Sequence, residues 1–508
     1  MINALLSPAA YAHPVSRIEC LETHISWVIL TGEFAYKIKK PVDLGFLDFR
    51  TLEQRRHFCE EELRLNRAWA SRLYLDVVPI VEVDGEVRVG GEGEPIDYAV
   101  RMRQFDQAMR LDHLVDAGRL TVDDVLELAE EIARRHTAAR RVSQDTDLLA
   151  TTERLIWDNF RELQGEVPDA FLRRLELWMR RTIARHDTLL GDRIGNGWFR
   201  ECHGDLHLAN IVRLPEGIRA FDCIEFSREL REIDVVADYA FLTMDFIACG
   251  TVGYAYTFVN RYLEKTGDYD GARLLPLYLL YRAMVRAKVA AIGSEQHKAR
   301  TDNAGDRHTL HRYCALARAL VSDRPPVLVL MTGLSGSGKT WLSTRLVPAL
   351  PALRLRSDIE RKRIFDLEES ADSGSGIAAG IYDREARTAV YEHLVHTAKD
   401  LLCAGMNVIL DATFLDASHR SLARQAADAC RVPCVVVHTR AAADTLVERL
   451  QRRVAAGDAS EADVQVLKHQ LDNNDPLDAT ELETTLTVET DAGIDVATIA
   501  ARIQQLRY

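Results

Sequence analysis

The run VLVLMTGLSGSGKT at residues 327–340 decides the fold of the carboxy-terminal third of the chain. Its first five residues are all apolar, which is typical of a strand buried in a parallel sheet. The loop that follows has the pattern G-x-x-x-x-G-K-[ST] from Gly333 to Thr340. Because this loop comes directly after a strand, the run predicts an α/β domain whose P-loop binds Mg-ATP.

Each part of the P-loop has a physical role in this prediction. Glycines let successive backbone N–H groups converge on phosphate oxygens, because no Cβ stands in the way. The helix after the loop adds its positive N-terminal end. Lys339 is expected to reach the β- and γ-phosphates, and the Thr340 hydroxyl to ligate Mg²⁺. The expected nucleotide-binding residues are Gly333, Ser335, Gly336, Ser337, Gly338, Lys339 and Thr340.

Two carboxylates follow apolar runs in the same domain. Asp358 ends a predicted second strand, where it could take a proton from an acceptor hydroxyl as catalytic base. The alternative is a helix N-cap at Ser357 or Asp358. Asp411 ends the apolar strand 407–411 and is expected to hold Mg²⁺, unless it is a structural strand-end residue.

A pair of arginines lies on a predicted helix near residue 450. Arg449 and Arg453 are four residues apart and therefore share one face of that helix. Such a pair could close over the transferring phosphoryl group and neutralise its charge. A solvated basic face is the alternative.

The residues from 327 to 508 resemble the P-loop kinases of the AAA_33, zeta-toxin-like and polynucleotide-kinase-like group. The resemblance rests on the P-loop, on Arg356-Ser357-Asp358, on Asp411-Ala412-Thr413 and on residues 448–453. It implies a three-layer α/β fold and phosphoryl transfer to a hydroxyl. The acceptors of this group include nucleic-acid ends, sugars and nucleotide sugars.

A second cluster of chemistry lies at His203-Gly204-Asp205-Leu206-His207-Leu208-Ala209-Asn210. Asp205 and Asn210 have the spacing of a kinase catalytic loop, in which the Asp meets the acceptor hydroxyl and the Asn meets Mg²⁺. Asp222 follows a short apolar strand and is expected to bridge metal and phosphates.

A lysine upstream is expected to bind the phosphates. Strands are predicted at 26–30 and 34–40, joined as a hairpin, and Lys37 and Lys39 point the same way from the second strand. Lys37 is the first choice and Lys39 the second, although both could be surface lysines. A helix over 52–70 offers consecutive glutamates as ion-pair partner, of which Glu62 is favoured.

Residues 20–290 resemble the aminoglycoside phosphotransferase and choline/fructosamine kinase-like family. The resemblance rests on the His203–Asn210 run, on the Asp222 motif and on Ala35-Tyr36-Lys37. It implies Asp205 as the base, and Asn210 and Asp222 as metal ligands. It also implies that Asp234 or Asp238 braces the catalytic loop.

Two prolines at 325 and 326 mark the predicted domain boundary. Residues 1–322 are expected to form an α+β bilobal protein-kinase-like domain, with a small lobe over 1–108 and a helical lobe over 109–322. Residues 327–508 are expected to form the P-loop kinase domain, an α/β three-layer fold with a parallel sheet.

The composition limits the other possibilities. A net charge of −13 disfavours binding of nucleic acid through a broad basic surface. The nine scattered cysteines predict reduced thiols and a cytoplasmic location rather than a disulfide framework. No secretory signal is recognised at the start of the sequence. The apolar stretch 237–256 contains two aspartates and therefore predicts a buried helix rather than a membrane span.

These observations predict an ATP- and Mg²⁺-dependent phosphotransferase with two kinase-type sites, each acting on a hydroxyl of a small-molecule acceptor. One alternative makes one domain a nucleotide-gated regulatory module. Another is a polynucleotide kinase for RNA or DNA 5′ ends, which predicts a basic groove near Arg356, Arg361, Lys362 and Arg363. The acceptors and the oligomeric state do not follow from the sequence.

Overall fold

Two units make up the fold in the computed structural model. The structure describes residues 1–45, 47–142, 147–296, 303–322, 324–369, 371, 373, 380–456 and 462–506. Residues 1–162 and 187–245 form the first unit, and residues 163–186 and 246–508 form the second. The domain division near residue 322 stays a prediction.

A six-stranded antiparallel sheet opens the first unit, in the order β1-β2-β3-β6-β4-β5. The predicted hairpin is confirmed, since β2 pairs with β3, and β4 pairs with β5 in a second hairpin. At the second turn Asp84 and Gly85 both have positive φ, which suits the twist of a tight hairpin. The strands are β1 (Glu19–Glu22), β2 (Ser26–Leu30), β3 (Phe34–Lys39), β4 (Tyr74–Val83), β5 (Glu86–Val89) and β6 (Pro95–Arg103).

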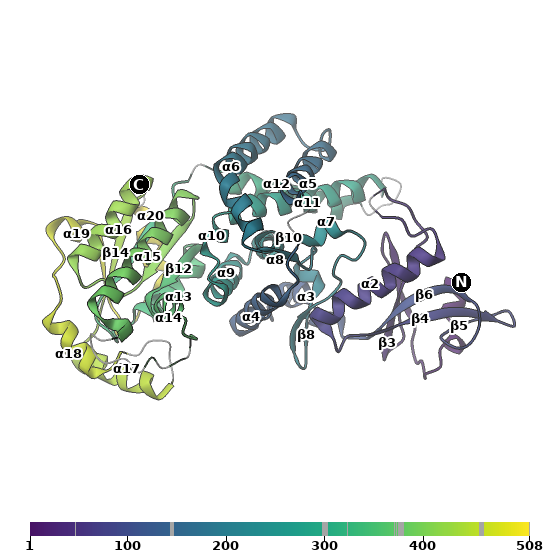
Figure 1. Ribbon diagram of the computed structural model, residues 1–508, viewed down its shortest axis with the longest axis horizontal. Helices are drawn as coiled ribbons and strands as arrows, with labels where there is room; N and C mark the ends of the chain where they lie inside the picture. The colour runs from purple at the N-terminus through teal and green to yellow at the C-terminus, as the bar shows by residue number, and fades with distance from the viewer. Residues whose placement is uncertain are drawn as a thin grey trace. The chain divides into compact units, whose positions relative to one another are not determined.

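Helix α2 (Leu52–Ala70) has the predicted bounds and lies along this sheet (Figure 1). It begins in a capping box, in which the Thr51 hydroxyl accepts from the Gln54 N–H and the Gln54 side chain accepts from the Thr51 N–H. Its apolar side packs on the sheet through Cys59 and Ala70. This packing fixes which of its glutamates face the strands.

The rest of the first unit is mostly helical, with two short two-stranded antiparallel sheets. Strand β8 pairs with β9, and β7 pairs with β10. The helices and strands are η1 (Pro8–Ala10), η2 (Gln107–Met109), η3 (Leu208–Asn210), α1 (Ile2–Leu5), α3 (Leu111–Asp116), α4 (Val122–Ala138), α5 (Leu148–Glu162), α7 (Arg228–Arg231), β7 (Phe199–Glu201), β8 (Ile211–Leu214), β9 (Gly217–Ala220) and β10 (Glu232–Asp234).

The prediction of one buried helix over 237–256 is wrong. The structure has two helices there, α8 (Val235–Ala248) and α9 (Val252–Thr266). They are separated at Gly250, whose φ of 79° a helix does not accommodate. No helix among the described residues has the length and apolar character needed to cross a membrane.

The second unit contains a five-stranded parallel sheet in the order β12-β13-β11-β14-β15. Strand β11, which leads into the P-loop, is central and all of its residues are buried. The predicted parallel sheet is therefore confirmed. The strands are β11 (Leu328–Thr332), β12 (Ala352–Arg356), β13 (Asn407–Asp411), β14 (Cys434–Arg440) and β15 (Thr485–Glu489).

Helices cover this sheet (Figure 1). One apolar cluster joins Val329 and Val437 of the sheet to Leu346 of α13 and Ile503 of α20, with Tyr256 of α9 packed against it. The remaining helices of the chain, not all of which contact this sheet, are α6 (Asp169–Gly195, kinked at His186), α10 (Tyr269–Ala272), α11 (Leu275–Gln296), α12 (Asn303–Leu320), α13 (Lys339–Ala349), α14 (Ser357–Ile364), η4 (Gly380–Tyr382), α15 (Arg384–Cys403), α16 (Ala417–Cys430), α17 (Ala443–Ala456), α18 (Val464–Asp472), α19 (Ala479–Glu483) and α20 (Val496–Gln505).

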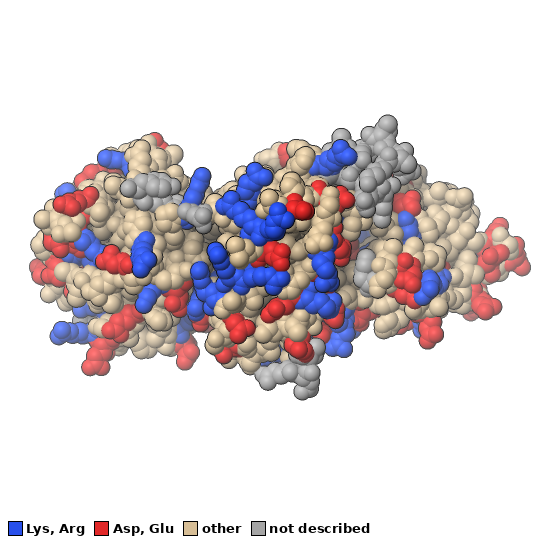
Figure 2. Space-filling model, turned by 90° about the horizontal axis from the view of Figure 1, so that it is seen from above, with Lys and Arg blue, Asp and Glu red and all other residues tan. Residues whose placement is uncertain are grey.

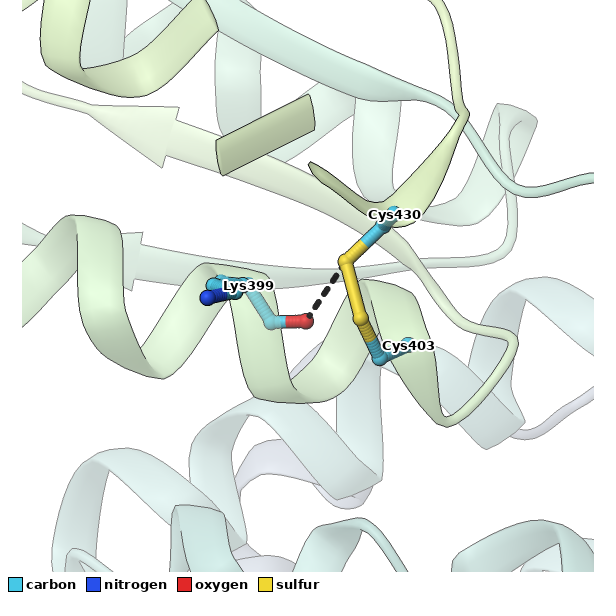
Figure 3. Close-up of a disulfide and its surroundings, with 3 residues drawn as sticks. All are labelled: Lys399, Cys403 and Cys430. Atoms are coloured by element: carbon cyan, nitrogen blue, oxygen red, sulfur yellow. Dashed lines mark hydrogen bonds between the residues drawn. A yellow bond between two sulfur atoms is a disulfide. The ribbon is translucent and has the colours of Figure 1, made fainter. Parts of the chain in front are cut away.

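A disulfide joins the ends of α15 and α16, so the prediction of reduced thiols is wrong for this pair. Cys403 and Cys430 are 27 residues apart in sequence, but their Cα atoms lie 5.4 Å apart, within the range that a disulfide needs. The Cys430 sulfur lies 3.3 Å from the Lys399 carbonyl oxygen (Figure 3). A disulfide sulfur carries no proton, so this contact is a hydrogen bond only when Cys430 is a free thiol.

Candidate active sites

Lys37 of β3 lies where three charged groups of the first unit meet. Its Nζ donates to Glu62 Oε1 at 2.9 Å and also contacts the Asp222 carboxylate. Burial by itself would lower the pKa of Lys37, but the carboxylates of Asp222 and Glu62 raise it well above its usual value. The expected lysine–glutamate pair between strand and helix is therefore formed, and it reaches the Asp222 loop.

Lys39 occupies a second, deeper position beside the same glutamate. Its Nζ donates to Glu62 Oε2 at 2.7 Å and also contacts Glu225, and its side chain is fully buried. Burial would raise the pKa of Glu62, but Lys37 and Lys39 lower it to about 2. Both lysines are thus on one side of β3 as the alternation predicts, and Glu62 holds them both.

The predicted catalytic loop brings Asp205 and Asn210 together. Asn210 Nδ2 donates to Asp205 Oδ2 at 2.9 Å, and the Asn210 carbonyl accepts from the Phe221 N–H at 2.9 Å. The second bond ties the loop to the residue before Asp222. The carboxylates of Asp205 and Asp222 keep 37% and 41% side-chain exposure, so both remain accessible to a ligand.

Asp222 has a left-handed backbone with a φ of 66°. The Tyr74 hydroxyl accepts from its N–H at 3.1 Å, and Asn66 of α2 accepts from the Cys223 N–H at 3.0 Å. Such a backbone conformation costs free energy outside glycine and persists where the surroundings hold it. These contacts from the sheet and α2 fix the direction of the Asp222 carboxylate.

Asp238, rather than Asp234, braces the catalytic loop. Its two oxygens accept from the N–H groups of His203 and Gly204 at 3.0 and 2.9 Å, and Oδ2 also lies 3.1 Å from His136 Nε2. Asp234 instead forms a buried pair with Arg193, with N–O distances of 2.6 and 2.7 Å. The sequence left these two aspartates open, and their surroundings separate them.

The P-loop of the second unit needs its glycines. Gly333, Gly336 and Gly338 have φ values of 137°, 83° and 90°. A Cβ at Gly333 would lie 2.4 Å from the Thr439 carbonyl oxygen, and one at Gly336 would lie 2.9 Å from that of Leu446. The backbone can therefore take this path only without side chains at those positions.

Lys339 and Thr340 begin helix α13 at the end of this loop. Lys339 Nζ donates to the carbonyls of Gly333 and Leu334 at 2.9 and 2.8 Å, so it lies over the loop. The Ser337 hydroxyl lies 2.7 Å from that of Thr439, which holds the loop to β14. The P-loop arrangement expected from the sequence is present.

Asp411 ends β13 beside the start of α13, as expected of a metal-binding carboxylate. Its Oδ1 lies 3.4 Å from the Thr340 hydroxyl, and its Oδ2 accepts from the Ser343 hydroxyl at 2.8 Å. Hydroxyl and carboxylate oxygens are ligands that Mg²⁺ prefers. Thr340 and Asp411 therefore form a donor set that fits this ion.

Asp358 lies on α14, not at the end of the strand before it. The N-cap of α14 is Arg356, with no side-chain cap, so the N-cap alternative at Ser357 or Asp358 is wrong. Asp358 instead lines a cleft of about 370 Å³ together with Lys339, Thr340 and Asp411. The role of Asp358 as catalytic base stays a prediction.

Arg449 of α17 contacts main chain in the P-loop unit. Its Nη1 donates to the Gly336 carbonyl and to the Thr490 hydroxyl at 3.3 and 2.7 Å, and Nη2 donates to the Thr490 carbonyl at 2.8 Å. In this arrangement Arg449 supports the loop. The side chain of Arg453 lies outside the described residues.

The basic run after β12 does not form an exposed groove. Arg361 and Lys362 are buried, and Lys362 Nζ donates to the Glu369 carbonyl. Arg363 pairs with Glu360. Elsewhere, on the face in Figure 2, basic side chains gather near the middle of the view with acidic ones among them. Arg361 lines the cleft of the P-loop beside Asp358, and the polynucleotide-kinase alternative stays a prediction.

Two residues of the P-loop cleft, Gln470 and Tyr391, were not recognised in the sequence. Gln470 of α18 donates to the Ser335 hydroxyl and accepts from the Ser335 N–H at 3.0 and 2.8 Å. The Tyr391 hydroxyl lies 2.9 Å from that of Thr413, at the end of β13. Neither has a motif of its own, because each arrives from a distant part of the chain.

Known proteins resemble the chain over most of its length. The uncharacterized proteins Rv2004c of Mycobacterium tuberculosis and Mb2027c of Mycobacterium bovis are each 33% identical over 468 residues, which is 90% of this chain and 90% of each relative. The chain belongs to the family of these mycobacterial proteins. In addition, the AAA domain family AAA_33 matches residues 328–477, which confirms the resemblance of the P-loop domain.

Solved structures of kinases are also similar to parts of the chain. A choline/ethanolamine kinase family protein from Mesorhizobium loti is 13% identical with a TM-score of 0.40, over 62% of this chain and 90% of that one. A gluconokinase from Sinorhizobium meliloti is 18% identical with a TM-score of 0.26, over 36% of this chain and 95% of that one. The fold assignment rests on the strand orders and the site geometry above.

Proposed function

We propose that the chain is an ATP- and Mg²⁺-dependent phosphotransferase with two kinase-type sites, each transferring the γ-phosphate of ATP to a hydroxyl of a small molecule. The observation that carries the proposal is the cleft of the second unit. There a phosphate-binding lysine, Lys339, lies beside two carboxylates, Asp358 and Asp411. The first unit repeats this combination of a lysine with two carboxylates, in Lys37, Asp205 and Asp222.

In the first unit, Lys37 would contact the phosphates, and Glu62 would hold it in place. Asp205 would accept the proton of the attacking hydroxyl, since its carboxylate is exposed and its orientation is fixed by Asn210. Asn210 and Asp222 would hold the metal. When bound there, Mg²⁺ would offset the negative charge of the phosphates.

In the second unit, the P-loop amides and Lys339 would hold the phosphates. Thr340 and Asp411 would hold the metal, and Asp358 would accept the proton of the acceptor. Arg449 and Arg453 were expected to offset charge on the transferring group. The main-chain contacts of Arg449 favour a role in holding the loop.

A screen tests this function. Hydroxylated metabolites are incubated with γ-labelled ATP and with the wild type, Asp205→Asn or Asp358→Asn. Each variant is expected to lose one labelled product while binding ATP normally, because only the base has changed. If both variants keep full turnover, Asp205 and Asp358 are not the bases. If a variant forms every labelled product of the wild type and the substituted unit still binds ATP, that unit has a regulatory role.

A further inference from the structure

Helix α9 is attached to the edge strand of the P-loop sheet by one side-chain amide. Asn260 Nδ2 donates to the Ala352 carbonyl at 2.8 Å, and its Oδ1 accepts from the Arg354 N–H at 2.6 Å. The side chain of Asn260 is buried. It satisfies the outward-facing groups of β12 in the way that a neighbouring strand would.

One turn further along α9, Glu264 begins a buried chain of polar contacts. Arg354 Nη2 donates to Glu264 Oε1 at 2.8 Å, and Arg354 Nη1 donates to the Ser343 hydroxyl at 3.3 Å. The Ser343 hydroxyl in turn lies 2.8 Å from Asp411 Oδ2. Glu264, Arg354, Ser343 and Asp411 are all less than 9% exposed.

The chemistry of the groups sets the direction of this chain. A guanidinium only donates hydrogen bonds, and an ionised carboxylate only accepts them. Ser343 therefore accepts from Arg354. Its single proton has two acceptors in reach, and Asp411 Oδ2 at 2.8 Å is closer than the Thr340 carbonyl at 3.2 Å. The bond to Oδ2 fixes one oxygen of Asp411, while the other lies toward the Thr340 hydroxyl.

We propose that Glu264, Arg354 and Ser343 are positioning residues for Asp411, and that helix α9 thereby sets the affinity of the P-loop site for Mg²⁺. The inference rests on the metal-binding role of Asp411 in the proposed function. Groups that orient a metal-binding side chain tune metal affinity without touching the ion. Without the Glu264 carboxylate, Arg354 would be a buried cation with no acidic partner and would shift toward other acceptors.

The test measures the affinity of the full chain for ATP by titration calorimetry, with Mg²⁺ and with EDTA. A chain with an inactive first-unit site, Lys37→Met, is the background, so that only the P-loop site is observed. The quantity compared is the factor by which Mg²⁺ tightens binding. We expect Ser343→Ala to lower this factor about tenfold, and Glu264→Gln about threefold, with EDTA affinities unchanged.

Glu369→Gln is the matched control. Glu369 also accepts from α9, from Arg261 and Lys265 at 2.9 and 2.8 Å. Arg261 lies 3.3 Å from Glu264 Oε2 as well, so this variant changes the surroundings of Glu264 while leaving its bond with Arg354 in place. The variant Glu369→Gln should leave the factor by which Mg²⁺ tightens ATP binding at the value measured for the Lys37→Met chain. Thermal unfolding verifies that the variants fold. If Glu264→Gln does not fold, Ser343→Ala, which removes only one hydroxyl, decides the test.

The inference is overturned if Ser343→Ala and Glu264→Gln leave the Mg²⁺ factor unchanged. It is also overturned if they weaken ATP binding equally with Mg²⁺ and with EDTA, because such a loss reports a purely structural role. If Mg²⁺ does not tighten ATP binding to the background chain, the proposed function itself fails, and this outcome is distinct from the other two.

Discussion

Replacing Lys39 with methionine should destabilise the first unit far more than the same change at Lys37. Lys39 is fully buried between Glu62 and Glu225, which have side-chain exposures of 0% and 3%. Its loss leaves Glu225 as a buried carboxylate without a cation, which costs about 3–5 kcal/mol. In Lys37→Met, Glu62 keeps Lys39, and Asp222 at 41% exposure is already open to solvent, so the cost is about 1–2 kcal/mol.

Hydrogen exchange measured by mass spectrometry separates the two variants, because it reports on β3 and α2 without averaging over both units. The slowest amides of α2 should exchange about two to four orders of magnitude faster in Lys39→Met. They should exchange about tenfold faster in Lys37→Met. ATP binding to the first unit should be lost in Lys37→Met. The reasoning is refuted if α2 in Lys39→Met is as protected as in the wild type, or if Lys37→Met is the less protected variant.

Three further changes have expected outcomes. Gly333→Ala should abolish nucleotide binding to the second unit, because the Cβ of the introduced alanine would lie 2.4 Å from the Thr439 carbonyl oxygen. Binding is measured with a fluorescent ATP analogue, and an unchanged affinity would contradict the P-loop geometry. Burial, with Arg273 and Arg185, lowers the pKa of His186 from 6.5 to about 4, so the unfolded chain takes up the proton first. The contribution of neutral His186 to the free energy of unfolding is therefore fully present above pH 6.5 and is lost as the pH falls toward 4. The melting temperature of His186→Leu should fall less over this pH range than that of the wild type. Cys403→Ser should lower the free energy of unfolding of the second unit by about 3 kcal/mol, since the disulfide closes a loop of 27 residues. Thiol titration of the unfolded wild type should find two more thiols with reductant than without. Equal counts would exclude the disulfide.

Local motifs account for what the sequence could predict. The P-loop, the Asp205–Asn210 spacing and the α2 helix are each determined by residues close together in the chain. Lys37 and Lys39 were both recognised because a strand alternates its side chains. The parallel sheet followed from short apolar runs between helical segments.

The rest depended on contacts between distant residues. Asp234 and Asp238 look alike in sequence, and only the backbone of residues 203–204 distinguishes them. The disulfide joins helix ends that are close only after β13 and β14 pair with β11. The contact of α9 with β12 has no signal in the sequence, because one asparagine and one glutamate on an ordinary helix make it.

The number of ATP molecules bound per chain tests the existence of two sites most directly. Equilibrium dialysis with Mg²⁺ and a non-hydrolysable ATP analogue should give two per wild-type chain. Lys37→Met and Lys339→Met should each give one, and the double variant none. One analogue per wild-type chain, or complete loss of binding in either single variant, would contradict two independent sites.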